Sequence, residues 1–457
     1  MKNSTENNAV QLPHPFADFF LKPNSLRQQR IRTFVLITVL VLGGLSLLTQ
    51  HRWVLTTDFE KDFLAVYVLA QTLAHGYDIS IPVNDLARKY EINLNKPAFV
   101  HPSPHPPTMG FLLMPLALFG YRTAKVVWFL VELTSLYYSI YLFSIIERKP
   151  LSWKWTLGIT LALQTWHPVI LELSNGQVHG FLLLCLAGTW YAMDRNRPVL
   201  AGVLLGLGLL IKQLAWPVGL VFLARKDYRA LGAAAVTVLA GYGTVALWIG
   251  YTPVYFYLTQ TLPAVSALYQ NHPLNLSLWT IGNRLFQGTP GADFAGHKIA
   301  LIPLLTAPAA GRLVTVAIPL LLLLVFWRSM GRMKDSDILL SLAVCLSIVL
   351  NPFSWPHYYV LALLPLAQAV HLFAMNHFPK RETNWFLVIA FFLIPTPFDW
   401  KNLAFLLSGM RYDPGHVMVI HALPSLVILI PAFAVMGLAV FLIRVGCRNT
   451  SRDNEAK

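Results

Sequence analysis

Residues 34–48 read Phe-Val-Leu-Ile-Thr-Val-Leu-Val-Leu-Gly-Gly-Leu-Ser-Leu-Leu and contain no charged side chain. The run ends at the polar triplet Gln50-His51-Arg52. A helix over 33–50 is long enough to cross the hydrocarbon core of a bilayer, which needs roughly 17–25 residues. Further apolar runs of this kind follow along the chain, so we expect an all-α polytopic membrane protein.

The composition supports this fold class. Of the 457 residues, 56% are hydrophobic and 12% are charged, whereas soluble proteins have about 25% charged residues. The first 32 residues are polar and the apolar run after them has no small-residue cleavage site, so a signal peptide is not expected. The three cysteines, at 185, 345 and 447, are scattered and predict neither a disulfide framework nor a metal site.

The net charge of +14 at first suggests a nucleic-acid partner. The positions of the basic residues argue against one, because 22 of the 35 lysines and arginines fall in segments assigned to the cytoplasm. An excess of Lys and Arg in cytoplasmic loops is the usual orientation signal of membrane proteins. These segments are 1–32, 147–154, 194–197, 225–229, 328–334, 376–383 and 444–457.

The apolar runs predict about 12 crossings, within a range of 10–13, with both termini in the cytoplasm. One transmembrane domain, 33–443, then lies between cytoplasmic tails at 1–32 and 444–457. Residues 198–224 look like a short hairpin with Lys212 at its tip. The spans are expected near 33–50, 123–146, 156–173, 178–193, 198–210, 211–224, 230–249, 311–328, 336–350, 358–375, 384–396 and 416–443.

Two long segments, 51–107 and 250–310, are expected outside the membrane on its outer face. Apolar residues at helical spacing predict an interfacial helix over 60–75. Residues 289–310 are rich in Gly, Ala and Pro and predict an irregular loop. The chain has neither a Walker loop nor a dinucleotide fingerprint, so a nucleotide-driven pump is not expected.

Polar residues gather on this predicted outer face. An acidic patch with Asp58, Glu60 and Asp62 follows the first span, and ionisable groups at a membrane surface indicate function. A carboxylate can act as a base on a hydroxyl group, and cationic side chains can stabilise a phosphate leaving group. The other outer-face candidates are Asn175, Gln177 and His179 at one outer turn, with Glu172 just inside it, and Lys212, Asn275, Arg284, His357 and Tyr358.

Each candidate also has a simpler interpretation. Asp58 and Glu60 could be solvated interfacial charges, and Asp62 could cap a helix. Lys212 could extend to the membrane surface, and Arg284 could be a loop charge without a ligand. Asn175-Gly176-Gln177 could be only a tight turn between two spans, His357 could be hydrogen-bonded to a turn, and Tyr358 could belong to the aromatic belt.

Five motifs, in order, resemble glycosyltransferase family 87, a family of bacterial GT-C-type membrane enzymes that includes polyprenol-phosphate-mannose-dependent mannosyltransferases. The resemblance covers roughly residues 55–375. The matching stretches are Asp62–Ala70 with Gly76–Asp78, Phe99–Leu118, Asn175–Gln177, Ala201–Gly206 with Ile211, Lys212 and Pro217, and Ser354–Tyr358.

This resemblance implies a GT-C-type fold and transfer of a sugar from a polyprenyl-phosphate donor to a lipid-linked glycan or glycolipid, with inversion. Asp62 would be the general base, because it alone in the patch has Phe and Tyr at the family's offsets. Lys212, Arg284 and His357 would contact the donor phosphate, with at least two of them in one pocket. Gln177 and Asn175 would orient sugar hydroxyls, and Tyr67, Asn275 and Tyr358 complete the expected substrate-binding set.

The expected location is a bacterial cytoplasmic membrane, with the active site on the extracytoplasmic side. We expect no cofactor, metal or nucleic acid, and the oligomeric state stays open. The chain departs from the family at His101-Pro102-Ser103-Pro104 and at Val66, which leaves the transferred sugar open. A transporter or flippase of polyprenyl-linked glycans is the competing function, although its inverted repeats and midplane polar residues are not found. An inactive scaffold is a third alternative.

Overall fold

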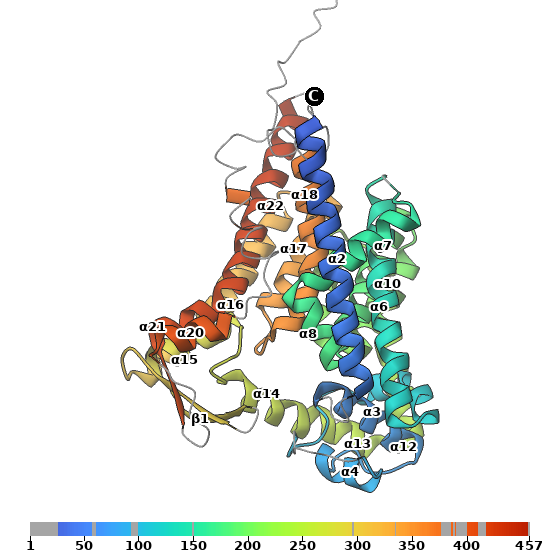
Figure 1. Cartoon of the computed structure of the whole chain (residues 1–457), viewed down its shortest axis with the longest axis vertical. Coiled ribbons are helices and arrows are strands. Elements are labelled where there is room, and N and C mark those ends of the chain that lie inside the picture. The colour runs from blue at the N-terminus through green and yellow to red at the C-terminus, as the bar shows by residue number, and fades with distance from the viewer. Residues whose placement is uncertain are drawn as a thin grey trace, which may run out of the picture.

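The computed structural model describes residues 26–56, 61–92, 99–148, 150–294, 297–333, 335–375, 385–386, 389, 400–409 and 417–455. Most of these residues are helical, as predicted. Long helices run along the vertical axis of Figure 1, and shorter elements gather at the end away from the C-terminus.

Five helices in the described part of the chain are long and apolar enough to cross a membrane, or six if the bent pair α8–α9 is one span. The finding agrees with a helical membrane protein, and the count of 12 crossings stays a prediction. The long helices are α2 (Leu26–Thr56), α6 (Tyr121–Ile146), α12 (Tyr228–Ile249), α16 (Pro308–Met330) and α22 (Ile430–Glu455).

The shorter helices of the bundle lie between these spans. The predicted hairpin at 198–224 is present as α10 and α11, which are interrupted after Ile211. The predicted span 384–396 lies almost wholly outside the described residues. The shorter bundle helices are α7 (Trp153–Ala162), α8 (His167–Asn175), α9 (His179–Asp194), α10 (Pro198–Ile211), α11 (Pro217–Ala224), α17 (Ser336–Val349) and α18 (Leu363–Met375).

Small residues let two of these helices approach closely. A Cβ atom added at Gly202 of α10 would collide with the carbonyl oxygen of Ala230 in α12, and one added at Gly206 would lie 2.6 Å from Cβ of Thr237. Close backbone contact through glycine is the common way for helices to associate where the surrounding solvent is apolar. It fixes α10, and with it the turn at Lys212.

Helix α2 differs from the rest because the protein covers so little of it. Only 6% of its apolar window is buried. It is attached along one line, where Gly43 lies against the carbonyl of Leu161 and the Ser46 hydroxyl donates to the carbonyl of Gln164 at 2.6 Å. Exposed apolar side chains around the rest of its surface are what a lipid-facing helix requires.

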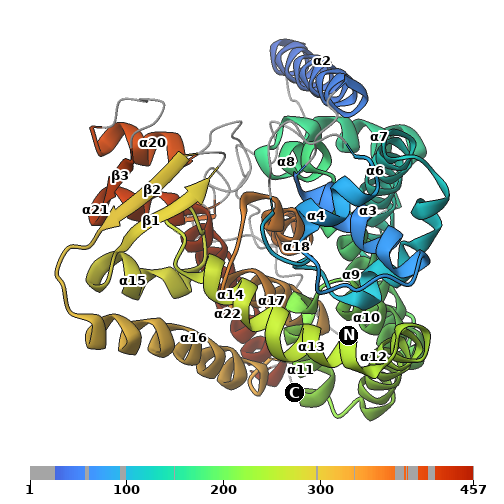
Figure 2. The same ribbon diagram turned by 90° about the horizontal axis from the view of Figure 1, so that it is seen from below.

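The opposite end of the molecule from the C-terminus contains two groups of short elements (Figure 2). In one of them, β1 (Thr289–Phe294) pairs antiparallel with β2 (His297–Ile302), and β2 pairs parallel with β3 (Met418–His421). The prediction of an irregular loop at 289–310 is therefore wrong for 289–302. The pairing depends on a strand more than a hundred residues away, which local composition does not reveal.

The other group is built around α3 (Lys61–Ala74). The predicted helix over 60–75 is thus present, but protein covers it on all sides, because every side chain from Phe63 to Ala70 is at most 4% exposed. An arm of helices runs between the two groups in Figure 2. The arm is α13 (Tyr251–Phe256), the π-helical turn η4 (Tyr257–Thr261) and α14 (Leu262–Gln270).

The remaining elements are short. They are α4 (Val83–Lys89), α5 (Pro107–Leu112), α15 (Ile281–Phe286), α20 (Trp400–Leu407), α21 (Ala422–Ser425) and the turns η1 (Met114–Leu118), η2 (Leu163–Thr165), η3 (Gln213–Ala215), η5 (Leu278–Thr280), η6 (Pro356–Ala362) and η7 (Leu426–Leu429).

Candidate functional site

The site is organised by the sharp turn between α8 and α9, which meet at 116°. Helix α8 ends at Gly176, which has a left-handed φ of 61° and a backbone N–H that bonds to the carbonyl of Leu173. Glycine tolerates this conformation without strain. A Cβ atom at Gly176 would lie 2.6 Å from Cβ of Phe63, so the turn contacts α3 directly beside Asp62.

Two buried carboxyl groups cap the first turn of α9. Glu172 accepts from the backbone N–H groups of His179 and Gly180, the latter at 3.2 Å. Glu132, from the middle of α6, accepts from the N–H of Phe181 at 3.2 Å. The first N–H groups of a helix have no partner within the helix, so in an apolar environment such caps are needed.

Glu172 also reaches the imidazole of His179, whose Nδ1 lies 3.1 Å from Oε2 of Glu172. On the other side of the ring, Nε2 of His179 lies 2.9 Å from the amine of Lys212. An ammonium group can only donate, so Nε2 accepts and Nδ1 carries the proton that is donated to Glu172. These three residues form one hydrogen-bonded chain.

Lys212 stands between α10 and η3 in an extended backbone conformation, with φ −157° and ψ 124°. Its amine lies 3.9 Å from the centre of the Tyr358 ring, which is a cation–π distance. The Tyr358 ring in turn contacts the ring of His179 at 4.4 Å between centroids. Lys212 itself is only half-buried, so part of its side chain stays accessible.

Two further histidines lie near this amine. His357 contacts the His179 ring at 5.1 Å, and its buried Nε2 has no hydrogen-bond partner among the described residues. His105, from the proline-rich segment, interacts electrostatically with Lys212. Burial, together with the charge of Lys212, lowers the pKa of His105 to about 3, so this imidazole is neutral at physiological pH.

Asp62 lies at the edge of the same cluster. It occupies the first turn of α3 and is half-buried. Its charge acts on Lys212, Tyr358 and Tyr269, which come from three other segments. The described structure therefore brings a carboxylate, an ammonium group and three imidazoles to one place. Asp58 and Glu60, the other acidic residues of the patch, lie outside the described residues.

The two predicted sugar-binding residues lie on the α8–α9 turn. Gln177 is buried, its main-chain carbonyl accepts from the indole of Trp128 at 2.8 Å, and its side-chain Oε1 has no hydrogen-bond partner among the described residues. Asn175 is half-buried at the end of α8. Both stand within four residues of His179 in the chain. Their contact with a sugar stays a prediction.

Arg284 is not part of this cluster. Its guanidinium group is fully buried and donates to the carbonyls of Pro273, Asn275 and Ser425 and to the hydroxyl of Thr280. These bonds hold α15 against the segment before η7. Lys212 and His357 therefore come together as predicted, whereas the geometry around Arg284 indicates a structural role.

Asn275 and Tyr67 are also engaged in bonds within the protein. The Asn275 amide donates to the carbonyls of Tyr269, Gln270 and Pro352, and its oxygen accepts from the N–H groups of Ser277 and Ser354. It fixes the turn that leads to His357.

The Tyr67 hydroxyl donates to the carbonyl of Phe119 at 2.8 Å and accepts from Gln71 at 2.7 Å. Neither side chain is oriented toward Lys212 by these bonds. Their predicted contact with substrate stays untested.

The sequence places His179 and Glu172 at the outer turn beside Asn175 and Gln177 without giving either a role, and it singles out neither His105 nor Glu132. The signal for the two glutamates was present, since a carboxylate within an apolar helix is costly and usually functional. His105 gave no comparable signal, because only the fold brings it within electrostatic range of Lys212. Among the described residues, no group of three or more His, Cys, Asp or Glu side chains is arranged to hold a metal ion.

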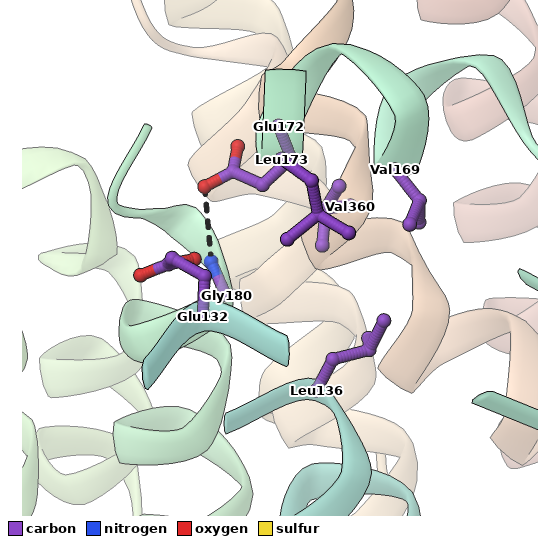
Figure 3. Close-up of a pocket in the computed structure, with 7 residues that line it drawn as sticks. All are labelled: Glu132, Leu136, Val169, Glu172, Leu173, Gly180 and Val360. Carbon is purple, nitrogen blue, oxygen red and sulfur yellow. Dashed lines mark hydrogen bonds between the residues drawn. The ribbon is translucent and has the colours of Figure 1, made fainter. Parts of the chain in front are cut away.

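A small cavity adjoins the two glutamates (Figure 3). Its volume of about 10 Å³ is on the scale of one water molecule. Oε2 of Glu132 is buried beside it and has no hydrogen-bond partner within the described structure. The lining residues are Glu132, Leu136, Val169, Glu172, Leu173, Gly180 and Val360.

Comparison with known proteins gives one family and one curated relative. The family model of glycosyltransferase family 87 matches residues 104–352, more than half of the chain. A polyprenol-phosphate-mannose-dependent alpha-(1-2)-phosphatidylinositol pentamannoside mannosyltransferase from Mycolicibacterium smegmatis is 24% identical over 349 residues, which are 75% of this chain and 76% of that protein. No solved structure matches significantly.

Proposed function

Because this chain belongs to glycosyltransferase family 87, we propose that it transfers a hexose, mannose in particular, from a polyprenyl-phosphate donor to a glycolipid or lipid-linked glycan. It is a membrane glycosyltransferase by its family and its apolar helices. The proposed donor follows the relative, whose name specifies polyprenol-phosphate-mannose. The proposed reaction takes place on the extracytoplasmic face.

In the proposed step, an acceptor hydroxyl oxygen attacks the anomeric carbon and the bond from that carbon to the phosphate oxygen breaks. The configuration inverts, and Asp62 takes the proton of the hydroxyl group. Polyprenyl phosphate leaves with the bonding electrons. Its growing negative charge is stabilised by the ammonium group of Lys212 and by a hydrogen bond from His357.

The observation that supports this most directly is the surroundings of Lys212. A half-buried ammonium group with three imidazoles and the Asp62 carboxylate around it matches what a displacement at phosphate-linked carbon needs. A cation receives the leaving group, and a base stands near it. Gln177, with its unpartnered Oε1, and Asn175 are the proposed contacts of the sugar hydroxyls.

Binding of undecaprenyl phosphate to the purified full-length protein tests the donor site. Lys212→Ala should weaken this binding about tenfold or more, because a charge-assisted hydrogen bond contributes roughly 1.5–3 kcal/mol. Lys154→Ala, at an exposed lysine near the start of α7, should bind as the wild type does. Unchanged binding by Lys212→Ala would overturn the donor-site assignment.

Activity is tested in liposomes that contain the protein, radiolabelled polyprenyl-phosphate-mannose and phosphatidylinositol mannosides. We expect labelled glycolipid from the wild type and more of it from mannose than from the glucose or galactose donors. Movement of the labelled donor across the membrane without any product would instead favour a flippase.

A further inference from the structure

Glu172 and Glu132 both cap α9, but only Glu172 contacts the imidazole of His179. Glu172 uses one oxygen for the backbone N–H groups and the other for Nδ1 of His179. Glu132 accepts from the N–H of Phe181, and its carboxyl group also interacts with that of Glu172, but no hydrogen bond joins it to the His179 imidazole in the described part of the chain. A carboxylate that served only as a cap would not need the imidazole contact, and the neighbouring glutamate shows that a cap without it is feasible.

The contact has a consequence for Lys212. A lysine amine on its four-carbon stem has many rotamers, and holding it in one place costs free energy whenever a ligand binds. Here, Nε2 of His179 already holds it at 2.9 Å, and the Tyr358 ring supports it from another side at 3.9 Å. The amine is therefore ordered before any ligand arrives.

We propose that Glu172 and His179 position Lys212 for the donor phosphate, with Glu172 fixing the His179 tautomer that accepts from the amine. Glu172 is thus a positioning residue that acts on the phosphate through two other side chains. The inference rests on the proposed donor site at Lys212. It goes beyond that proposal because it makes Glu172 and His179 responsible for the position and the charge of the Lys212 amine.

The two glutamates make a matched pair for the test. In Glu172→Gln, the amide oxygen can still accept from the backbone N–H groups, so the cap is kept. The amide NH₂ then faces Nδ1 of His179, which must accept, and Nε2 must carry the proton and point it at the ammonium group of Lys212. Glu132→Gln also keeps its cap, and it removes no group that is hydrogen-bonded to the His179 imidazole.

We therefore expect Glu172→Gln to bind undecaprenyl phosphate roughly 10- to 100-fold more weakly, the usual size of an effect transmitted through a residue that orients a ligand-binding group. Glu132→Gln should differ from the wild type by less than about threefold. Thermal unfolding of both variants should be alike, because each keeps its helix cap. Equal binding by the two variants would overturn the proposal.

The pH dependence of the dissociation constant would not change if Glu172 had only a structural role, so a pH series tests the proposal separately. The Glu172 carboxylate favours the charged form of Lys212, so the rise in the dissociation constant with pH should begin at a lower pH in Glu172→Gln than in the wild type. The titration of the phosphate probe is common to both proteins and cancels in the comparison. The charged and titratable groups that face Lys212 are Glu172, His179, Asp62, His105, His357 and Tyr358. An unchanged profile would count against the proposal.

Two histidine variants keep the inference testable if Glu172→Gln does not fold. His179→Asn keeps a donor near the Nδ1 position and loses the acceptor for Lys212, whereas His179→Gln does the reverse. Both should weaken probe binding, and wild-type binding by both would refute the proposal.

Lys212→Ala distinguishes a failure of the donor-site proposal from a failure of the positioning proposal. If it binds normally, the donor site itself is wrong. If it binds weakly while Glu172→Gln and the histidine variants bind normally, only the positioning inference fails. In the double variant Lys212→Ala/Glu172→Gln, we expect no loss beyond that of Lys212→Ala alone, because the effect of Glu172 passes through the amine.

Discussion

Asp62 is the residue on which the proposed chemistry depends most. It stands in the first turn of α3, half-buried, with its charge acting on Lys212, Tyr358 and Tyr269. The contact of Gly176 with Phe63 keeps this end of α3 beside the α8–α9 turn. The carboxylate is therefore held near the cation that would receive the leaving group.

Asp62→Asn should lower turnover by about 10²–10⁴-fold, the usual contribution of a general base. Asparagine suits the start of a helix as well as aspartate does, so the protein should fold and bind undecaprenyl phosphate normally. The measurement is initial rate with saturating donor, alongside probe binding. Asp58→Asn is the control and should cost much less.

The opposite ranking of the two variants would identify Asp58 as the base. Severe losses in both would indicate a pair of carboxylates. Full activity in both would mean that neither residue takes the proton.

Some side-chain positions in the candidate site could be predicted from the sequence, and others could not. Lys212 and His357 are brought together as expected, because both stand at turns on one side of the bundle. Arg284 and Asn275 come from the same predicted outer face, yet their side chains bond to main-chain groups. Residue type cannot distinguish a cation that binds a ligand from one that binds carbonyl groups, since both need a buried polar partner.

At the level of elements, Arg284 joins three segments in the group of short elements that contains the sheet. It ties α15 to the loop at 273–275 and to Ser425 at the end of α21, which follows strand β3. These hydrogen bonds to carbonyl groups offset the free-energy cost of burying the positive charge. The sheet and the arm through α14 are therefore connected through one side chain.

Arg284→Ala should destabilise the protein by about 3 kcal/mol or more, because it leaves three buried carbonyl groups without their donor. We expect a lower thermal unfolding temperature in detergent and a loss of protection from proteolysis at 289–302. Arg312→Ala, at an arginine outside these contacts, is the control. A stable Arg284→Ala protein that fails to bind undecaprenyl phosphate would instead support the direct phosphate contact predicted from sequence.

The elements that sequence patterns predict well are those with local signals. The apolar runs at 123–146, 230–249 and 311–328 are each close to one observed helix. The break at Lys212 follows from polar residues between two short apolar runs. The sheet could not be predicted, since β2 pairs with β3 across more than a hundred residues, and neither could the electrostatic interaction of His105 with Lys212.

For the whole molecule, the distribution of basic residues predicts both termini in the cytoplasm and the candidate site on the other side. Single cysteines placed at Ser80 and at Asn196, in a protein with Cys447 replaced by serine, test this map. An impermeant maleimide applied to intact cells should label the first and spare the second. Labelling at position 196 before lysis would overturn the orientation and, with it, the proposed extracytoplasmic reaction.

The small area of contact between α2 and the rest of the protein has a consequence for how the enzyme responds to its membrane. Because the protein covers so little of this helix, we expect its height to adjust to the thickness of the bilayer more freely than that of the packed helices. Only four residues separate its end at Thr56 from the start of α3 at Lys61, and Asp62 follows at once. We expect a change in bilayer thickness that moves α2 to move Asp62, the proposed base, as well, so acyl-chain length should alter the reaction rate.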